Sequence, residues 1–401
     1  MSDRPDVVVV GGGPAGSTTA ALLASAGHDV LVLEKEPFPR FHIGESLLPV
    51  CLPVLEQLEI EPEPATYLYK RGAEFVDERS GQRRTFDFGD ALPGCSGNAW
   101  HVERAGFDRQ LINRAVELGA RFRHDAKVVR VEFGDQPGDD PVVLHTRDGE
   151  ALGARYVVDA SGQNRLLARH HGSAEPLPNF GQTAAFVHAE GLSDDAIEDI
   201  GEGNAIRVMI TQHGWGWLIP LTGRRLSVGL VCREGQSAAQ QIENFIAQSP
   251  LVQRWTAGTT ISDVRLERNF SFNNTRPHGA RFCCVGDSAC FLDPVFSSGV
   301  SLAMVGAWHM VELLSEALAE GREGDPTLMD PHASFMETGY RTFSSMIDRF
   351  YNTHFVEHFI FGPHGEGKTY REIVTVLAGD VWRDDNDFQR MLRRSRRRRA
   401  G

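Results

Sequence analysis

The chain has 401 residues, more than the roughly 250 to 300 at which single hydrophobic cores stop growing, so we expect two closely packed lobes. Hydrophobic residues make up 41% and charged residues 24%, as in ordinary globular proteins, and no run approaches the ~18 apolar residues of a membrane span. The net charge of -13 disfavours general nucleic-acid binding, which requires a basic face.

The two terminal segments and the cysteines indicate the cellular compartment and the partners of the protein. The first apolar segment begins at Val7 and runs directly into a glycine turn, unlike a signal peptide, so we expect a cytoplasmic protein. The six cysteines form no C-x-x-C pair and no zinc-like spacing, which predicts reduced, buried thiols and no metal. At the other end, "RRSRRRR" (residues 393–399) is typical of a solvated tail, although six arginines would also attract an acidic partner.

Strands and helices alternate along the first third of the chain. Val7 to Val10 predicts a strand buried on both faces of a parallel sheet, "STTAALLASAG" a helix that ends at Gly27, and "DVLVLEK" a second strand. "FDRQLINRAVEL" predicts another helix, with Gly119 as its stop signal. "ARYVVDASG" and "RFCCVG" predict two more buried strands, and the second leads into a long helix closed by Gly321.

These pieces of one nucleotide-binding domain are scattered, which indicates that a second domain is inserted between them. "AIRVMIT" and "RLSVGLVC" alternate as the strands of that second sheet would. We therefore expect an α/β fold: a Rossmann-like dinucleotide-binding domain, an inserted mixed β-sheet substrate domain and a helical C-terminal region. The expected boundaries are 1–71, 101–172 and 268–325 for the first domain, 72–100 and 173–267 for the substrate domain, 326–392 for the helical region and 393–401 for the basic tail.

A glycine fingerprint marks the nucleotide site. Gly11, Gly13 and Gly16 form G-x-G-x-x-G between a strand and a helix, where the backbone can approach a pyrophosphate over the helix N-terminus. Glu34 ends the second strand, and a carboxylate there accepts hydrogen bonds from ribose hydroxyls. The fingerprint alone leaves FAD and NAD open.

Three further segments distinguish the two cofactors. "GDSACFLDP" puts Asp287 after a buried strand, "HVERAGFDRQL" puts Arg104 just before a helix, and "VVDASG" supplies Asp159 and Gly162. With the glycine fingerprint and these segments in this order, the chain resembles the FAD-dependent monooxygenase superfamily, whose fold is of the glutathione-reductase type. The resemblance implies FAD, bound by Gly11, Gly13, Pro14, Ala15, Gly16, Glu34, Lys35, Arg40, Ser46, Arg104, Asp159, Gly286, Asp287, Pro294, Gly299 and Val300.

Four motifs narrow the resemblance to flavin-dependent halogenases that act on phenols and pyrroles. They are "GESLLP", "YKRGAEF", "WGWLIP" and "DPVFSSGV". Trp215 and Trp217, two residues apart on a strand, point to one face and can wall off a cavity; the alternative is that they are core residues, and prenyl reductases carry a similar segment. The resemblance implies that they keep the organic substrate away from the flavin.

The resemblance makes Lys70 the catalytic lysine. In an apolar tunnel its pKa falls toward neutrality, so that it can hydrogen-bond hypochlorous acid or become a chloramine. The alternative is an ordinary surface lysine between Tyr69 and Arg71. Backbone amides near Ser298 and Gly299 are expected to bind the halide at a helix start.

Two departures from relatives bear on the substrate. Phe296 stands where tryptophan-acting halogenases carry a glutamate, which favours a phenol or pyrrole substrate. "LAGDVW" resembles the late helical region of halogenases that act on pyrroles tethered to carrier proteins, although the chain ends earlier than many of them. The tail arginines would then speed encounter with an acidic acyl or peptidyl carrier protein.

The resemblance implies a reaction in which a flavin hydroperoxide oxidises chloride or bromide to hypohalous acid, which Lys70 positions against the ring. No second nucleotide fingerprint follows a strand, so we expect reduced FAD from a separate reductase. Three alternatives remain open: an FAD monooxygenase or oxidase without a halide requirement, a prenyl double-bond reductase, and a non-catalytic flavoprotein that senses redox state and docks a partner.

Overall fold

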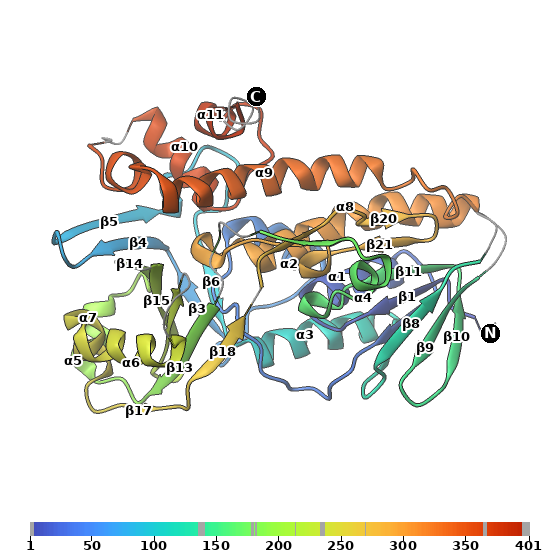
Figure 1. The fold of residues 1–401 in the computed structure, drawn as a ribbon, viewed down its shortest axis with the longest axis horizontal. Coiled ribbons are helices and arrows are strands. Elements are labelled where there is room, and N and C mark those ends of the chain that lie inside the picture. The colour runs from blue at the N-terminus through green and yellow to red at the C-terminus, as the bar shows by residue number, and fades with distance from the viewer. Residues whose placement is uncertain are drawn as a thin grey trace.

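A computed structural model describes residues 4–134, 141–177, 180, 183–212, 214–232, 237–268, 270–363 and 367–394. Figure 1 shows one sheet with its helices at the right, a second sheet at the left, and helices of the C-terminal third along the top. The α/β fold with an inserted mixed sheet and C-terminal helices, predicted from the sequence, is confirmed.

The first sheet has six strands, in the spatial order β20 (His278–Gly279), β21 (Phe282–Cys284), β11 (Tyr156–Asp159), β1 (Val7–Val10), β2 (Val30–Leu33) and β7 (Arg121–Arg123). The strands from β21 to β7 are parallel. Side chains of β1 alternate between two cores: Val7 and Val9 join the helices, whereas Val8 and Val10 join a three-stranded sheet. Burial on both faces explains the uninterrupted valine run.

The elements that cover this sheet come from distant parts of the chain. One face carries α1 (Pro14–Ser25), α2 (Leu52–Gln57), α3 (Arg104–Glu117) and α8 (Ser298–Glu320). The other carries the three-stranded sheet β8 (Val128–Glu132), β9 (Val142–Thr146) and β10 (Ala151–Ala154), together with α4 (Leu166–His171). Helix α1 begins at Pro14, three residues earlier than the pattern predicts, because proline at the first helical position is compatible with the helix.

The second sheet has eight strands. Seven of them follow the spatial order β17 (Thr260–Ile261), β13 (Thr183–Glu190), β16 (Arg225–Cys232), β15 (Gly214–Leu221), β14 (Ile206–Thr211), β4 (Gly72–Asp77) and β5 (Gln82–Asp87), and β18 (Arg265–Arg268) also pairs with β13. The sheet is mixed, because β14 and β4 are parallel and its other pairs are antiparallel. One face packs on α5 (Asp194–Ile200), α6 (Ala238–Gln248) and α7 (Pro250–Thr256), and the other face carries Trp215 and Trp217.

Short strands connect the two sheets. β3 (Tyr67–Lys70) and β6 (Ala99–Val102) form an antiparallel pair, and Ser46 adds a bridge to His101 on the other side of β6. β12 (Ala174–Pro176), β19 (Phe272–Asn274) and β22 (Cys290–Phe291) form a small sheet beyond α4. Lys70 therefore lies on a pair of strands that belongs to neither large sheet.

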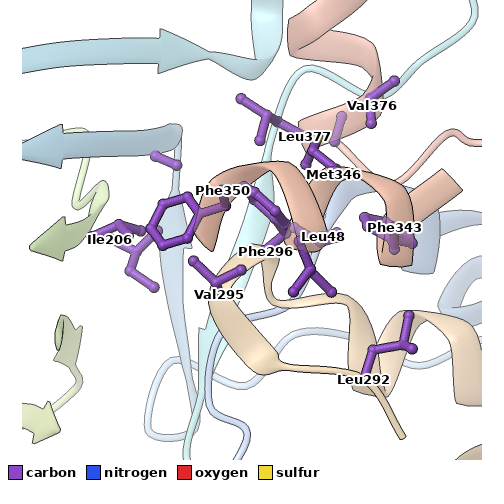
Figure 2. Close-up of a cluster of buried hydrophobic side chains, with 14 of the residues drawn as sticks. Leu48, Ile206, Leu292, Val295, Phe296, Phe343, Met346, Phe350, Val376 and Leu377 are labelled. Carbon is purple, nitrogen blue, oxygen red and sulfur yellow. The ribbon is translucent and has the colours of Figure 1, made fainter. Parts of the chain in front are cut away.

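The C-terminal helices cover the inner face of the second sheet. They are α9 (Asp330–Asn352), a π-helical turn over Val356–Ile360, α10 (Lys368–Leu377) and α11 (Asp387–Arg394). Figure 2 shows how Phe350 of α9 and Leu377 of α10 meet Phe296 and Ile206 in one apolar cluster. Helix α11 takes in Arg393 and Arg394, the first residues of the expected basic tail; residues 395–401 lie outside the described residues.

One helix among the described residues has the length and hydropathy of a membrane span, namely α8. Its window is 56% buried inside the protein, where it packs against α1 and α9. A buried core helix passes the same length and hydropathy test, so α8 is an element of the protein's own core.

Candidate active site

A cleft of about 590 Å³ lies where the first sheet, the inner face of the second sheet and the start of α8 meet. Its floor is the turn between β1 and α1, and its walls include the loop around Arg40 and the indoles of β15. The lining thus draws on segments spread over most of the chain, as expected for a dinucleotide site at the carboxyl ends of parallel strands.

The glycine fingerprint gives the cleft its floor. Gly11 has φ +107°, and a Cβ atom there would lie 2.3 Å from the Ala160 carbonyl oxygen. A Cβ atom on Gly16 would lie 1.9 Å from the carbonyl oxygen of Gly11. No other residue type fits these positions without moving the backbone, so β1, α1 and the loop after β11 approach closely. Gly13 is the N-cap of α1 and leaves the helix N-terminus open to the cleft.

Glu34 holds the end of β2 against this turn. One carboxylate oxygen accepts a hydrogen bond from the Gly12 amide at 2.8 Å, and the other accepts one from the Glu36 amide at 3.1 Å. Each carboxylate oxygen has a second lone pair, so Glu34 can still accept hydrogen bonds from a ribose. Lys35 lies at the rim of the cleft and pairs with Glu36.

Two arginines of the cleft share one buried carboxylate. Arg104 forms a bidentate pair with Asp108, with distances of 2.8 and 3.0 Å, and Arg40 reaches the same carboxylate at 3.0 Å. Arg104 is the first residue of α3 rather than a residue before it. Asp108 was not predicted from the sequence, because an Arg–Asp pair four residues apart on a helix is usually a surface feature. Here the Asp108 side chain is fully buried and holds two positive charges at the cleft.

Most of the residues predicted from the sequence meet in this cleft. Three predicted residues lie elsewhere: Gly16 packs behind Gly11, Lys70 lines a separate cavity, and Asp159 is fully buried with its carboxylate accepting from the amides of Ser161 and Leu167. The cleft surface near β11 comes instead from the residues that follow Asp159. The predicted residues that line the cleft are Gly11, Gly13, Pro14, Ala15, Glu34, Lys35, Arg40, Ser46, Arg104, Trp215, Trp217, Gly286, Asp287, Pro294, Ser298, Gly299 and Val300.

Asp287 lies in the turn after β21 and lines the cleft. Burial raises the pKa of Asp287 to about 6, and the nearby charge of Arg104 opposes this shift. A carboxyl group held this way either accepts or donates a hydrogen bond near neutral pH.

The two tryptophans of β15 form one wall of the cleft. Their ring centroids lie 5.7 Å apart, and both side chains are buried. The Trp215 indole donates a hydrogen bond to Asp293 at 3.0 Å, and the Trp217 indole donates to Ser227 at 3.1 Å. Both rings are therefore fixed in orientation, and they line the cleft on the side of the second sheet.

Lys70 is 1% exposed, whereas its neighbours Tyr69 and Arg71 point outward. Its Nζ atom donates a hydrogen bond to the Leu47 carbonyl oxygen at 2.7 Å and lies 5.1 Å from the centroid of the Phe88 ring. Burial lowers the pKa of Lys70 to about 7, and a Coulombic interaction with Cys51 opposes this shift. The alternative of an ordinary surface lysine does not describe this side chain.

The space beside Lys70 is a cavity of about 10 Å³, enough for one water molecule. Ile206 and Ser297 line both this cavity and the large cleft, so the two spaces adjoin. Phe296 forms another wall and packs against the rings of Phe75 and Phe350, at centroid distances of 6.4 and 5.9 Å. No carboxylate is among the residues that line the cavity, within the part of the chain that the structure describes.

Buried polar atoms in the cleft match a hydrogen-bonding ligand. Among the described residues, Ser46 Oγ and Glu45 Oε2 are buried and have no partner, and both residues line the cleft. Buried polar atoms are normally satisfied, so a bound group with hydroxyls, amides or phosphates fits here. Together with the glycine floor and the paired arginines, this arrangement fits FAD.

The fold and this cleft define a dinucleotide-binding enzyme, and comparison with known proteins narrows the class. The tryptophan halogenase family model matches residues 6–98 and 94–359. A 1H-pyrrole-2-carbonyl-peptidyl-carrier-protein chlorinase of Pseudomonas fluorescens is 31% identical over 415 residues, which cover 95% of this chain and 91% of that protein.

Two solved structures share the fold over almost the entire chain. A flavoprotein/dehydrogenase from Cytophaga hutchinsonii has a TM-score of 0.87 and 26% identity, covering 99% of this chain and 98% of that one. A triple mutant of the flavin-dependent brominase Bmp2 has a TM-score of 0.85 and 25% identity, covering 99% of this chain and all of that one (100%). The chain belongs to the tryptophan halogenase family and is a flavin-dependent halogenase of aromatic substrates.

Proposed function

We propose that this enzyme attaches chloride or bromide to a phenol or a pyrrole and that Lys70 carries the halogen to the ring. The observation that carries this proposal is the position of Lys70: buried, in an apolar cavity that adjoins the large cleft, with a pKa of about 7. An amine that is partly neutral at physiological pH is both a hydrogen-bond partner and a nucleophile toward an electrophilic halogen.

The cofactor-binding role falls to the residues that line the cleft. The α1 N-terminus at Gly13 and the cations Arg40 and Arg104 suit the diphosphate, and Glu34 suits a ribose. Asp287 suits the ribityl chain or the flavin ring. When bound and reduced by a separate reductase, FAD with oxygen supplies the oxidant that converts halide to hypohalous acid. Six free cysteines suit the reducing cytoplasm that we propose for the protein.

The start of α8 is the proposed halide site. Ser297 adopts φ +56°, and α8 begins at Ser298, so the amides of Ser298 and Gly299 lie in the first turn of a 23-residue helix. The first amides of a helix have no partner within it and carry partial positive charge, which favours an anion. Both residues line the cleft, so a halide here is adjacent to the proposed flavin position.

Trp215 and Trp217 separate the two reactants. Their fixed rings fill the wall of the cleft on the side where Ile206 and Ser297 border the Lys70 cavity. Hypohalous acid, which is larger than water, enters that cavity as the bordering side chains move, whereas the fixed indoles keep the much larger aromatic ring from the flavin. The chain thus contributes geometry: it keeps the ring from the oxidant and fixes which carbon atom meets the halogen.

The protonation state of Lys70 determines how it handles the halogen. The neutral amine accepts the halogen from hypohalous acid, forming an N–halogen bond and releasing water; the ammonium form instead holds hypohalous acid by a hydrogen bond. The ring carbon then takes the halogen, and its proton returns to the amine nitrogen or to the hydroxide. Because the cavity contains no carboxylate among the described residues, the ring must be electron-rich enough to react without a second base, as phenols and pyrroles are.

A carrier-tethered substrate is the form that we favour. The Pseudomonas fluorescens relative is named for a pyrrole attached to a peptidyl carrier protein, and it matches this chain over nearly its full length. The cationic C-terminal run in the sequence suits an acidic carrier.

Mass spectrometry of products tests the proposal. The enzyme is supplied with FAD, a flavin reductase, oxygen and bromide, and is offered free phenols, free pyrroles and a carrier-bound pyrrole. We expect a bromine isotope doublet on an aromatic product and no product when bromide is omitted. Oxygenated or dehydrogenated product without any halide requirement would instead show a monooxygenase or oxidase.

A further inference from the structure

A buried aspartate joins the cleft to the C-terminal helices. Asp293 is fully buried, and one of its carboxylate oxygens accepts hydrogen bonds from the Trp215 indole at 3.0 Å and from the Val295 amide at 3.0 Å. The other oxygen accepts the phenolic hydrogen of Tyr351 at 2.6 Å. One carboxylate therefore connects the second sheet, the turn before α8 and the end of α9.

These contacts link three aromatic side chains in series, with a carboxylate between the second and the third. Trp217 and Trp215 line the cleft with ring centroids 5.7 Å apart, and Asp293 links Trp215 to Tyr351. Tyr351 is the penultimate residue of α9 and is partly exposed, whereas both tryptophans are at most 4% exposed. The series thus runs from the cofactor cleft toward solvent.

Among aromatic side chains, indole and phenol lose one electron most readily, and a phenol does so far more easily when a base accepts its proton. The Tyr351 hydroxyl already donates to a carboxylate at the distance of a strong, charge-assisted hydrogen bond. Hydrogen bonds alone would suffice to hold these side chains in place. Here they also put the Asp293 carboxylate, a proton acceptor, between the oxidisable rings of Trp215 and Tyr351.

We propose that Trp217, Trp215, Asp293 and Tyr351 form an escape route for oxidising equivalents that would otherwise damage the cleft. A one-electron oxidant of the hydroxyl-radical class, formed when hydrogen peroxide lost from flavin reoxidation is cleaved by a reduced metal ion in solution, takes one electron from the tryptophan pair and becomes hydroxide, leaving an indole radical cation at Trp215. Tyr351 returns one electron to Trp215 and passes its phenolic proton to Asp293, so that neutral Trp215, a tyrosyl radical and a protonated Asp293 result. A soluble thiol at the surface then restores Tyr351 by giving one hydrogen atom, and Asp293 loses its proton to solvent.

The route protects groups that the oxidant would otherwise reach. The cleft is lined by the thiol of Cys290 as well as by the indoles, and halogenation chemistry produces oxidants in that cleft. This inference goes beyond halogenation and requires only that FAD binds in the cleft, so it stands or falls separately from the role of Lys70.

Time-resolved absorption of the oxidised, FAD-loaded enzyme tests it. A short flash of blue light withdraws one electron from the protein through the bound flavin, and the spectra distinguish tryptophan radicals from the tyrosyl radical. We expect a tryptophan signal that decays into a tyrosyl signal in the wild type. Tyr351→Phe should lose the tyrosyl signal and prolong the tryptophan signal, and Asp293→Asn should slow the transfer.

Tyr370→Phe is the matched control, because the Tyr370 hydroxyl also donates to a carboxylate, Asp90, at 3.1 Å, but no tryptophan among the described residues donates a hydrogen bond to that carboxylate. It should leave both signals unchanged. A second measurement follows oxidised Trp215 and Trp217 by peptide mass spectrometry during aerobic turnover, and these products should accumulate faster in Tyr351→Phe. An unchanged tyrosyl signal in Tyr351→Phe overturns the proposal. Equal oxidation of Trp215 and Trp217 in Tyr351→Phe and Tyr370→Phe overturns it as well.

Discussion

The Nζ atom of Lys70 donates its hydrogen bond to the Leu47 carbonyl oxygen, at 2.7 Å, in a region from which solvent is excluded. Folding lowers the pKa of Lys70 from 10.5 to about 7 because the charged form loses its hydration. Between these values the unfolded chain holds a proton that the native state has released. Burying Lys70 therefore lowers the free energy of unfolding by its full amount below about pH 7. This destabilisation disappears as the pH rises above about 10.5.

Lys70→Met should accordingly stabilise the protein, and more so at low pH. By proton linkage the cost removed is about 4 kcal/mol near neutral pH and close to zero above about pH 10.5. Urea unfolding at about pH 6 and about pH 10 measures the difference. Lys368→Met is the control: this exposed lysine pairs with Asp387, so its loss should change stability little at either pH. An equal gain for Lys70→Met at both pH values contradicts the linkage.

Lys70→Ala should abolish halogenation while FAD binding and the oxygen-dependent reoxidation of reduced FAD continue. The reason is that Lys70 lies outside the cofactor cleft, in the adjoining cavity. Product analysis measures halogenation, flavin fluorescence measures FAD binding, and stopped-flow absorption measures the reoxidation of reduced FAD. Lys70→Arg keeps charged N–H donors but never supplies a neutral amine, so it should be inactive if the amine accepts the halogen and partly active if a cation only holds hypohalous acid. Halogenated product at the wild-type rate from Lys70→Ala ends the lysine mechanism.

The sequence predicted the parts of the molecule that depend on local spacing. The valine run of β1 and the strained position of Gly11 follow from steric rules that a short segment obeys by itself. The burial of Lys70 was inferred from a family motif, since its polar neighbours on the strand suggest a surface position. The structure shows the reason: adjacent strand residues face opposite sides.

Other features depend on contacts between distant segments. Asp159 was expected in the cleft, yet its carboxylate binds the amides of the following turn, which a lone acidic residue after a strand does not reveal. Asp293 and Tyr351 are 58 positions apart, and no local pattern indicates that they meet. Such pairings follow from how α9 crosses the turn before α8, and that crossing is a property of the packed molecule.

Asp108→Asn should weaken both the fold and cofactor binding. The change leaves the buried Arg104 without its charge partner and releases Arg40, and breaking a buried pair costs roughly 3 to 5 kcal/mol. FAD should restore part of this loss, because its phosphates supply negative charge to the same arginines. Thermal unfolding with and without FAD measures both effects. Asp77→Asn removes an exposed pair with Arg79 and should alter neither property; a similar loss in that variant would contradict this explanation.

Truncation after Arg394 should slow the reaction with a carrier-bound substrate only at low salt. The deletion removes the four arginines of "SRRRRAG" while leaving α11 intact, and screening weakens long-range attraction at high ionic strength. The ratio kcat/KM for a carrier-bound pyrrole is measured at low and high salt, and that for a free phenol serves as the control. An unchanged rate on the carrier-bound substrate at low salt dismisses the role of the tail.

Phe296→Ala should change the size of ring that the enzyme accepts. The cavity beside Lys70, at about 10 Å³, is far too small for an aromatic ring, so substrate must displace side chains such as Phe296 and Phe350, which pack edge to face. Removing the Phe296 ring should cost about 3 to 5 kcal/mol of stability and leave space next to the amine. We expect kcat/KM for a two-ring phenol to rise relative to that for a one-ring phenol. Phe282→Ala, in the separate core under the first sheet, should lose similar stability without shifting that ratio. An equal shift in both variants would show that general loosening, rather than space beside Lys70, governs ring size.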